Sequence, residues 1–122
     1  KDPRIAFRYL DAEDPHAHLS AAFMDALPRP FLAIEDGSHQ YRHVLNMIRF
    51  VDRYARPDDR LIVEDGIVTA LGMADEFEGG PLRAIHEFLA ECEGRWQIDP
   101  AYNDFFGPNM TWNPDGYLLR VG

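Results

Sequence analysis

The sequence predicts one α/β domain over residues 1–122, built on a mostly parallel sheet. Short apolar runs alternate along the chain with longer amphipathic segments, which is the pattern of strands and helices that follow one another in turn. Two of the apolar runs, residues 31–34 and 61–63, are continuous rather than alternating. Continuous runs are typical of strands buried on both faces of a parallel sheet. Breaks rich in proline and aspartate separate the segments at residues 28–30 and 57–59.

The order of the expected elements completes this prediction. The second helix carries Val44, Ile48 and Val51 on one side, so it is expected to pack on the sheet through that side. Pro81 suits the first turn of the third helix, where its missing N–H needs no partner. Helices are expected at residues 15–27, 41–54 and 81–93. Strands are expected before each of these helices, at residues 5–10, 31–34 and 61–63, and two closing strands are expected at residues 96–98 and 117–121.

The charge of the chain argues against nucleic acid as a partner. Acidic residues number 21 against 12 basic ones, which gives a net charge of −9. A surface that binds phosphates needs clustered Lys and Arg to release counterions, and no basic run is present. We therefore expect no nucleic acid among the partners of the chain.

The lengths of the apolar runs and the number of cysteines indicate where in the cell the protein is expected. No apolar run approaches the roughly 20 residues that cross a bilayer, so we expect no membrane span. The single cysteine, Cys92, cannot form an internal disulfide, which favours a reducing, cytoplasmic location. Its expected role is packing near the end of a helix.

Acidic residues follow three of the expected strands: Asp11, Asp36, and the pair Glu64 and Asp65. In an open α/β sheet, ligands bind beyond the carboxyl ends of the parallel strands. Neighbouring strands lie about 4.8 Å apart, so Asp36, Glu64 and Asp65 could converge on one point. Clustered carboxylates repel one another unless a cation neutralises them, and oxygen ligands favour Mg²⁺ or Mn²⁺ over zinc. The alternative is that these acids cap helices after the strands.

Two motifs at this spacing resemble the macrocin and mycinamicin type of sugar O-methyltransferases. They are I-E-D-G-S-H at residues 34–39 and I-V-E-D at residues 62–65. The later part of the chain is similar to the cephalosporin hydroxylase (CmcI-like) family, which has the same methyltransferase fold. The matching segments are residues 10–15, 79–85, 88–90 and 111–118.

The resemblance implies a Rossmann-like fold and an enzyme that uses S-adenosylmethionine (SAM) to methylate a hydroxyl group. By position in the motifs, Asp36, Glu64 and Asp65 would be the ligands of Mg²⁺ or Mn²⁺. The metal would hold the acceptor and activate its hydroxyl group. His39 would be the general base, a task that suits an imidazole because it titrates near neutral pH. Asp36 would also lie against the cofactor, and Asp11 would lie near its adenine.

One departure from the family pattern concerns the cofactor. The glycine-rich strand–turn–helix that normally opens the SAM-binding half is not found in this sequence, and there is no room for it before Arg4. We therefore expect the chain to correspond to the C-terminal half of such a domain, without the N-terminal glycine-rich βαβ part. Such a sheet would have an exposed edge, across which copies of the chain are expected to form a homo-oligomer.

Alternatives remain at the level of the sequence. The chain could be a non-catalytic α/β module or an oligomerisation fragment whose acids cap helices. An iron-dependent oxygenase would need a second histidine beside His39. His43 lies four residues later, but the sequence favours a packing or solvent-facing role for it rather than a zinc site. The acceptor stays open among a sugar, a catechol-like ring and an antibiotic intermediate.

Overall fold

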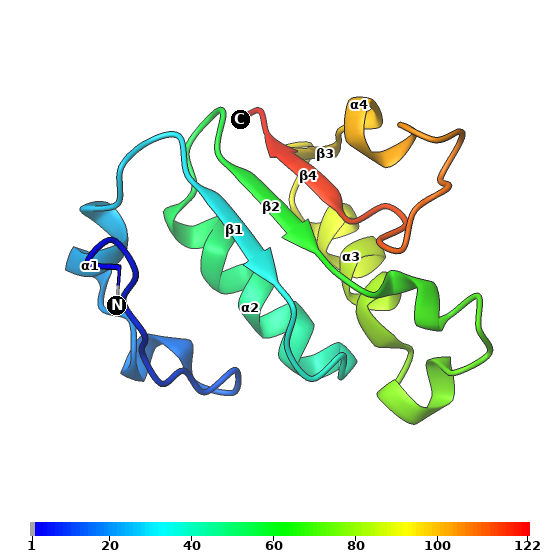
Figure 1. Ribbon diagram of the computed structural model, residues 1–122, viewed down its shortest axis with the longest axis horizontal. Helices are drawn as coiled ribbons and strands as arrows, with labels where there is room; N and C mark the ends of the chain where they lie inside the picture. The colour runs from blue at the N-terminus through cyan, green and yellow to red at the C-terminus, as the bar shows by residue number, and fades with distance from the viewer. Residues whose placement is uncertain (1) are drawn as a thin grey trace.

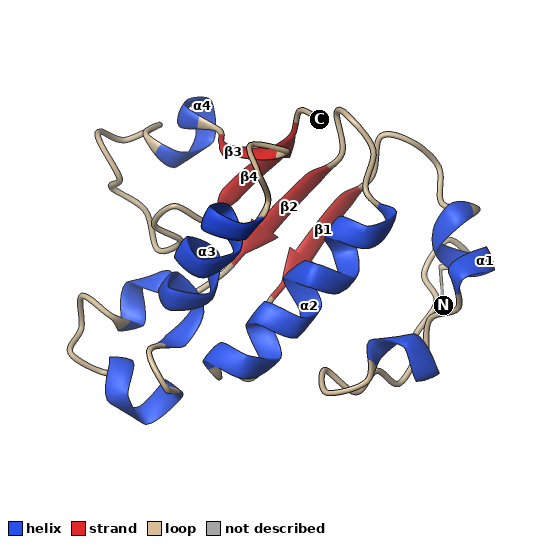
Figure 2. Cartoon of the chain, turned by 180° about the vertical axis from the view of Figure 1, so that it is seen from behind, coloured by secondary structure: helices blue, strands red, loops and turns tan. Residues whose placement is uncertain are grey.

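The computed structural model describes residues 2–122, which form two layers. The elements in chain order are η1 (Pro15–Ala17), α1 (Ala21–Asp25), β1 (Leu32–Glu35), α2 (Tyr41–Tyr54), β2 (Arg60–Val63), η2 (Gly66–Val68), η3 (Ala74–Phe77), α3 (Gly80–Glu91), β3 (Trp96–Ile98), α4 (Pro100–Asn103) and β4 (Tyr117–Arg120). The four strands form one sheet, and the two long helices, α2 and α3, lie on the same face of it (Figure 1; Figure 2).

The sheet is mixed, so the prediction of a mostly parallel sheet is wrong. The strand order is β1-β2-β4-β3, with β1 parallel to β2 and β4 antiparallel to both of its neighbours. Three strands therefore run in one direction, and the reversed strand β4 lies between β2 and β3. After β2 the chain continues through α3 to β3, which does not pair with β2. The later strand β4 then pairs with both β2 and β3. Only the pair β1–β2 is parallel as a result, and this pair carries the acidic motifs.

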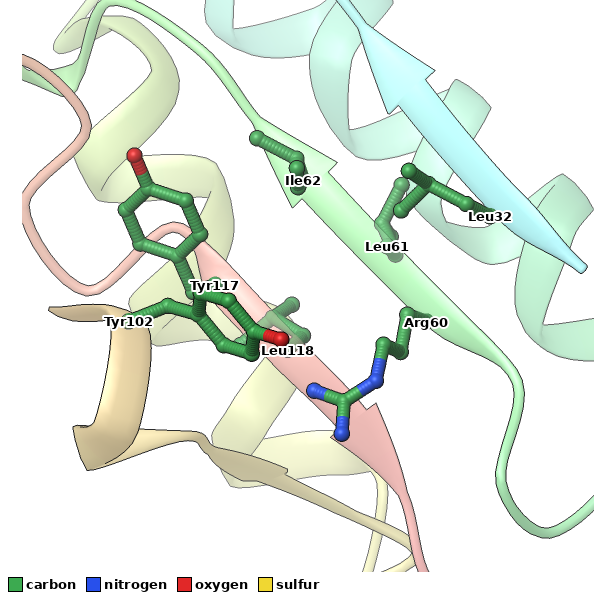
Figure 3. A pocket seen from close by; sticks show the side chains of 7 residues that line it. All are labelled: Leu32, Arg60, Leu61, Ile62, Tyr102, Tyr117 and Leu118. Carbon is green, nitrogen blue, oxygen red and sulfur yellow. The ribbon is translucent and has the colours of Figure 1, made fainter.

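Helices cover only one face of the sheet, so the prediction of strands buried on both faces is also wrong. Leu32 and Ile34 of β1 lie on the helix-free face and are 55% and 56% exposed. The same face has a shallow hollow beside Leu32, with mostly apolar and aromatic lining (Figure 3). The lining residues are Leu32, Arg60, Leu61, Ile62, Tyr102, Tyr117 and Leu118. Association of copies across the free edge of β1 stays a prediction.

The core lies between the sheet and the two long helices. Val44 and Ile48 of α2 and Ile85 of α3 are fully buried, as the helical spacing of apolar residues predicts. Cys92 is a free, buried thiol in the same cluster, which confirms its packing role. Across residues 2–122, each helix is too short or too polar to span a bilayer.

Residues 5–10, predicted to be the first strand, form no regular element. The run has the side chains of a strand, but strand propensity depends on pairing and burial. Ile5 and Tyr9 are 54% and 76% exposed in this segment. Asp11 consequently does not follow a strand, and the predicted meeting of three strand ends is reduced to two.

The helix predicted over residues 15–27 is divided into η1 and α1. The reason is that two residues cap separate helix starts. The carboxylate of Asp14 accepts a hydrogen bond from the Ala17 amide (3.3 Å), and the hydroxyl of Ser20 accepts one from the Phe23 amide (3.1 Å). The predicted apolar face nevertheless packs against the core through Leu19, Phe23 and Leu27.

The turn before β2 holds a carboxylate with no exposed surface, that of Asp59. Its oxygens accept hydrogen bonds from the amides of Phe31 (2.9 Å) and Arg56 (2.7 Å) and from the guanidinium of Arg29. The sequence shows residues 57–59 only as a turn. The structure shows that the last residue of this turn fixes the beginning of β1 to the beginning of β2.

The carboxylate of Asp52, another acid with several hydrogen bonds, joins α2 to β3 and β4. Its carboxylate accepts hydrogen bonds from Arg95 Nη2 (2.8 Å), Trp96 Nε1 (2.8 Å) and Arg120 Nη1 (2.5 Å). Burial alone would raise the pKa of Asp52, but the hydrogen bonds from Arg95 and Trp96 and the arginine charges outweigh burial and hold the pKa below its ordinary value.

Replacing Asp52 by Asn should lower the free energy of unfolding at pH 7 by about 1.5–3 kcal/mol, the range for hydrogen bonds to a charged group. Because the pKa is lower in the folded chain than in the unfolded chain, this stabilisation is complete above the unfolded value of about 3.9 and is lost as the pH falls through the folded value. Urea unfolding curves of the wild type and D52N should therefore differ at pH 7, still differ near pH 4, and converge only as the pH falls further, through the lowered pKa of the folded chain. Identical curves at pH 7 would contradict the assignment.

Candidate functional site

The carboxyl ends of β1 and β2 bring two of the predicted acids together. Asp36 directly follows β1, and Asp65 lies two residues beyond β2; the parallel register pairs Glu35 with Val63 at this edge. Asp36, His39 and Asp65 each offer one ligand atom, and the three atoms lie within 4.8 Å of one another. The structure thus assembles two carboxylates and an imidazole at the edge where ligands of α/β sheets bind.

His39 occupies a constrained position in this group. Its backbone is left-handed, with φ of 61°, which is uncommon for a residue with a side chain. The ring Nε2 lies 3.4 Å from Asp65 Oδ2, and the ring edge faces Phe77 with the centroids 5.6 Å apart. Within residues 2–122, the buried Nδ1 has no hydrogen-bond partner. The imidazole is therefore fixed next to the carboxylates and has a nitrogen that no protein group uses.

Asp65 is held by a residue that the sequence did not reveal as functional. Asp65 has a left-handed backbone with φ of 59°, and its amide donates a hydrogen bond to Asn113 Oδ1 (2.9 Å). The Asn113 side chain also donates to the Tyr117 hydroxyl (3.3 Å). Gly116 lets this loop approach β2, since a Cβ there would lie 2.2 Å from the Val63 carbonyl oxygen. Asn113 belongs to the segment 111–118, whose resemblance to the family was its only signal.

Glu64, the third predicted metal ligand, is not part of the group of ligand atoms found in residues 2–122. Its side chain is half-buried, and its amide donates a hydrogen bond to the Glu35 carbonyl (2.9 Å). The structure brings Asp36 and Asp65 together and leaves Glu64 outside the group. The ligand role of all three stays a prediction from the sequence.

Asp11, predicted to lie near adenine, closes a turn. Its carboxylate accepts a hydrogen bond from the Glu13 amide (2.9 Å). Its neighbours Leu10 and Ala12 line a cavity of about 260 Å³ that also includes Asp36. The structure therefore places Asp11 between two lining residues of a cavity that Asp36 also lines, while the contact with adenine stays a prediction.

His43 forms hydrogen bonds with Ser38 and Glu13 rather than a zinc site with His39. Its Nδ1 lies 2.8 Å from Ser38 Oγ, and its Nε2 lies 3.2 Å from Glu13 Oε1. Both ring nitrogens are thus engaged, and His43 is outside the metal-binding group of the described residues. Through His43, the turn after β1 is joined to Glu13, which lies 30 positions before His43 in the sequence. No local pattern could have revealed this contact.

Glu35, the last residue of β1, is an unexpected part of the site. It is 9% exposed, and its Oε1 accepts a hydrogen bond from the Gly37 amide (3.1 Å). Burial raises the pKa of Glu35, and the Gly37 amide and the His39 charge act in the opposite direction. The sequence analysis followed Asp36 in this motif. The alternation of β1, which turns Ala33 and Glu35 to the same side, was the signal for the neighbouring acid.

Comparison with known proteins bears on the reaction. The sequence model of the family described as "Rhamnosyl O-methyltransferase/CmcI" matches residues 13–121. No curated protein and no solved structure matches the chain. The match includes both acidic motifs and the segment that holds Asn113, and it confirms the resemblance found in the sequence. An O-methyltransferase transfers a methyl group to an oxygen, and SAM is the methyl donor that this reaction implies. The chain belongs to the rhamnosyl O-methyltransferase/CmcI family.

Proposed function

We propose that the protein is a metal-assisted, SAM-dependent O-methyltransferase that methylates a hydroxyl group of a small, sugar-like acceptor. The convergence of Asp36, His39 and Asp65 within 4.8 Å at the carboxyl edge of β1 and β2 carries this proposal. Family membership supports the general reaction. The rhamnosyl group in the description of the family favours a sugar over the other acceptors.

The donor set fits a hard divalent cation. Asp36 and Asp65 supply carboxylate oxygens, which Mg²⁺ and Mn²⁺ prefer, and the chain offers Glu64 next to them. A bound Mg²⁺ or Mn²⁺ would lower the pKa of an acceptor hydroxyl and orient it. The two aspartates hold and orient the ion at the strand ends, where the left-handed backbone of Asp65 and its bond to Asn113 fix the second carboxylate.

His39 is suited to remove the proton of the acceptor hydroxyl. Its Nε2 lies 3.4 Å from Asp65, and its Nδ1 has no partner among the described residues. Nε2, which faces the carboxylates, would take up the proton, and the carboxylate of Asp65 would stabilise the resulting imidazolium. Methyl transfer then needs the activated oxygen in line with the methyl group of SAM, so most of the acceleration comes from placement.

Helix capping does not account for the two clustered aspartates, and Asp11 stabilises a turn rather than a helix. Asp11 accepts a hydrogen bond from an amide in its own turn. Asp65 occupies the cap position of η2 without a side-chain cap bond, and the cap position of α2 belongs to Gln40 rather than to Asp36. A purely structural module therefore leaves Asp36 and Asp65 without a role.

The oxygenase alternative needs two histidines and a carboxylate around one metal. The group found in the described part of the chain has one histidine and two carboxylates. His43, the nearest histidine in sequence, uses both ring nitrogens in bonds to Ser38 and Glu13. The donor set favours the methyltransferase.

The experiment is a methyl-transfer assay with isotopically labelled SAM and rhamnose-bearing acceptors, with Mg²⁺ and after its removal by a chelator. Transfer should require the metal and return when Mg²⁺ or Mn²⁺ is restored. His39→Gln should reduce the rate of transfer by about 10²-fold, the lower range for loss of a general base. It should change Mg²⁺ affinity, measured by calorimetry, by less than about 3-fold, because a base does not hold the ion.

Two outcomes would contradict the proposal. Full transfer in the presence of a chelator would remove the metal from the mechanism. A fall in Mg²⁺ affinity in H39Q as large as its fall in rate would make His39 a metal ligand rather than the base. An exposed acid of η3 provides the control, since Glu76→Gln should alter neither quantity.

A further inference from the structure

The loop just before β4, residues 111–116, lies beside the end of β2 and the start of η2. The amide of Val63 donates a hydrogen bond to the Gly116 carbonyl (2.8 Å). Four residues later, the amide of Ile67 donates one to the Trp112 carbonyl (3.2 Å). Both bonds follow the antiparallel order in which β2 pairs with β4. The loop therefore extends this pairing beyond the sheet.

At Asp65, between these two bonds, a side chain takes the place of the main chain in the pairing. The backbone of Asp65 is left-handed, with φ of 59°, and its amide donates a hydrogen bond to Asn113 Oδ1 (2.9 Å). A left-handed residue leaves the extended path of a strand. The side-chain carbonyl of Asn113 therefore accepts a hydrogen bond that main-chain carbonyls accept on either side of it.

The side chain of Asn113 is itself held in this orientation. Its Nδ2 donates to the Tyr117 hydroxyl (3.3 Å), which leaves the amide oxygen on the side of Asp65. The main chain of Asn113 is fixed as well, since its amide donates to Thr111 Oγ1 (3.1 Å) and its carbonyl accepts from the Gly116 amide (2.9 Å). Asn113 is thus a preorganised acceptor for the Asp65 amide.

The loop also has anchors away from the site. The amide of Asp115 donates to Oδ1 of Asn103 (2.9 Å), a buried residue of α4. The carboxylate of Asp115 lies 2.8 Å from Nε2 of His86 in α3. Loss of the Asn113 side chain therefore leaves the loop attached to two helices.

The position of the Asp65 carboxylate depends on the contact with Asn113. A left-handed backbone is uncommon for a residue with a side chain, so a bond that favours it also decides where the side chain points. In this conformation one ligand atom of Asp65 lies within 4.8 Å of those of Asp36 and His39. Groups that orient a metal ligand without touching the ion typically change metal affinity by about 10–100-fold. Asn113 stands in this relation to Asp65.

We propose that Asn113 is a positioning residue of the candidate metal site, and that it sets the affinity for the ion by holding the backbone of Asp65. This inference rests on the proposed function, because it takes Asp65 as a metal ligand. Asn113 acts on the ion only through Asp65, so it changes how tightly the ion is held and not the transfer of the methyl group.

The first test needs no metal. Amide hydrogen exchange is measured by NMR on the full chain, labelled with ¹⁵N, for the wild type and Asn113→Ala. The Asp65 amide should exchange at least about 10-fold faster in the variant, because it loses its acceptor. The amides of Val63 and Ile67 should change by less than about 3-fold, because their acceptors are main-chain carbonyls that the substitution leaves in place.

Two further variants separate the bond from the fold. Asn113→Asp keeps an acceptor oxygen, so the Asp65 amide should exchange within about 3-fold of the wild-type rate. Tyr117→Phe removes the hydroxyl to which Asn113 Nδ2 donates, and it should speed this exchange by about 3-fold. The Tyr117 variant provides the test if Asn113→Ala does not fold.

The second test is calorimetric binding of Mg²⁺. Asn113→Ala should bind the ion at least about 10-fold more weakly than the wild type, and Asn113→Asp no more than about 3-fold more weakly. At saturating Mg²⁺, the rate of methyl transfer by Asn113→Ala should stay within about 3-fold of the wild-type rate.

His86→Gln is the matched control. It removes another side-chain contact of the same loop, the one with Asp115, and leaves the bond between Asn113 and Asp65 in place. It should change neither Mg²⁺ affinity nor exchange of the Asp65 amide by more than about 3-fold, as expected for an exposed side chain.

The outcomes distinguish the two proposals. Equal exchange of the Asp65 amide in the wild type and Asn113→Ala would overturn the role of Asn113 and leave the proposed function intact, as would faster exchange with unchanged Mg²⁺ affinity. Equal acceleration at residues 63, 65 and 67 would make Asn113 a general support of the loop and also overturn the inference. A wild type with a protected Asp65 amide that binds no Mg²⁺ would contradict metal assistance, and with it the role of Asn113 at the ion.

Discussion

Asp65→Asn should abolish metal-dependent methyl transfer, lowering its rate by about 10³-fold, which corresponds to about 4 kcal/mol of lost stabilisation by the metal. The carboxylate of Asp65 is one of two that meet at the strand ends, and it also faces the His39 ring at 3.4 Å. The substitution keeps the size of the side chain but removes the charge that holds a divalent ion. Affinity for Mg²⁺, measured by calorimetry, should fall by at least about 100-fold.

Glu64→Gln is the matched control for this prediction. It removes a carboxylate from the adjacent residue, whose side chain is outside the group of ligand atoms in the described residues. Its effect on Mg²⁺ affinity should be smaller than that of D65N. A larger effect would make Glu64 the principal ligand, as the sequence motif implies, and would contradict the arrangement of the site seen here. Unchanged Mg²⁺ binding by D65N would end the metal assignment.

Asp59→Asn should lower the free energy of unfolding by about 3–5 kcal/mol, the range for removing one partner of a buried ion pair. The carboxylate has no exposed surface, and it accepts hydrogen bonds from two amides and from Arg29. An amide group at this position cannot accept all three, and it leaves the half-buried guanidinium without a counter-charge. The measurement is urea unfolding at pH 7 followed by circular dichroism.

Asp58 provides the control next to Asp59 in the sequence. It is exposed, and it has a left-handed backbone with φ of 76°, which asparagine tolerates well. D58N should therefore change the free energy of unfolding by no more than about 0.5 kcal/mol. If the two variants unfold alike, the network around Asp59 does not stabilise the fold as argued.

Elements with a strong local signal were predicted well from the sequence. The second helix was expected over residues 41–54 and is found at Tyr41–Tyr54, because its apolar side chains recur with the helical period. The two strands that precede the acidic motifs were located to within one residue, at Leu32–Glu35 and Arg60–Val63. Their continuous apolar runs gave the position of each strand but could not show which faces would be covered.

Errors arose where distant parts of the chain decide the structure. Nothing local shows that β4 enters between β2 and β3, so the direction of the strand pairs was predicted wrongly. The run at residues 5–10 has the composition of a strand but no place in the sheet. Capping by Ser20 divides the first predicted helix, although its apolar face still packs on the core.

The candidate site shows the same division between local and distant information. The motifs identified Asp36, His39 and Asp65, which the structure brings together. They did not identify Asn113, which binds the amide of a residue 48 positions earlier. Glu35 was overlooked although it is adjacent to a predicted ligand, because its burial could be inferred only from the alternation of side chains along β1.

The central place of β4 has a consequence for synthesis of the protein. β2 gains its second neighbour only when β4 pairs with it, and Asp65 is fixed by Asn113 from the loop just before β4. A ribosome releases the acidic motifs while the residues that position them are still untranslated. The group of Asp36, His39 and Asp65 is therefore among the last parts of the described fold to take its final geometry, after β4 has left the exit tunnel.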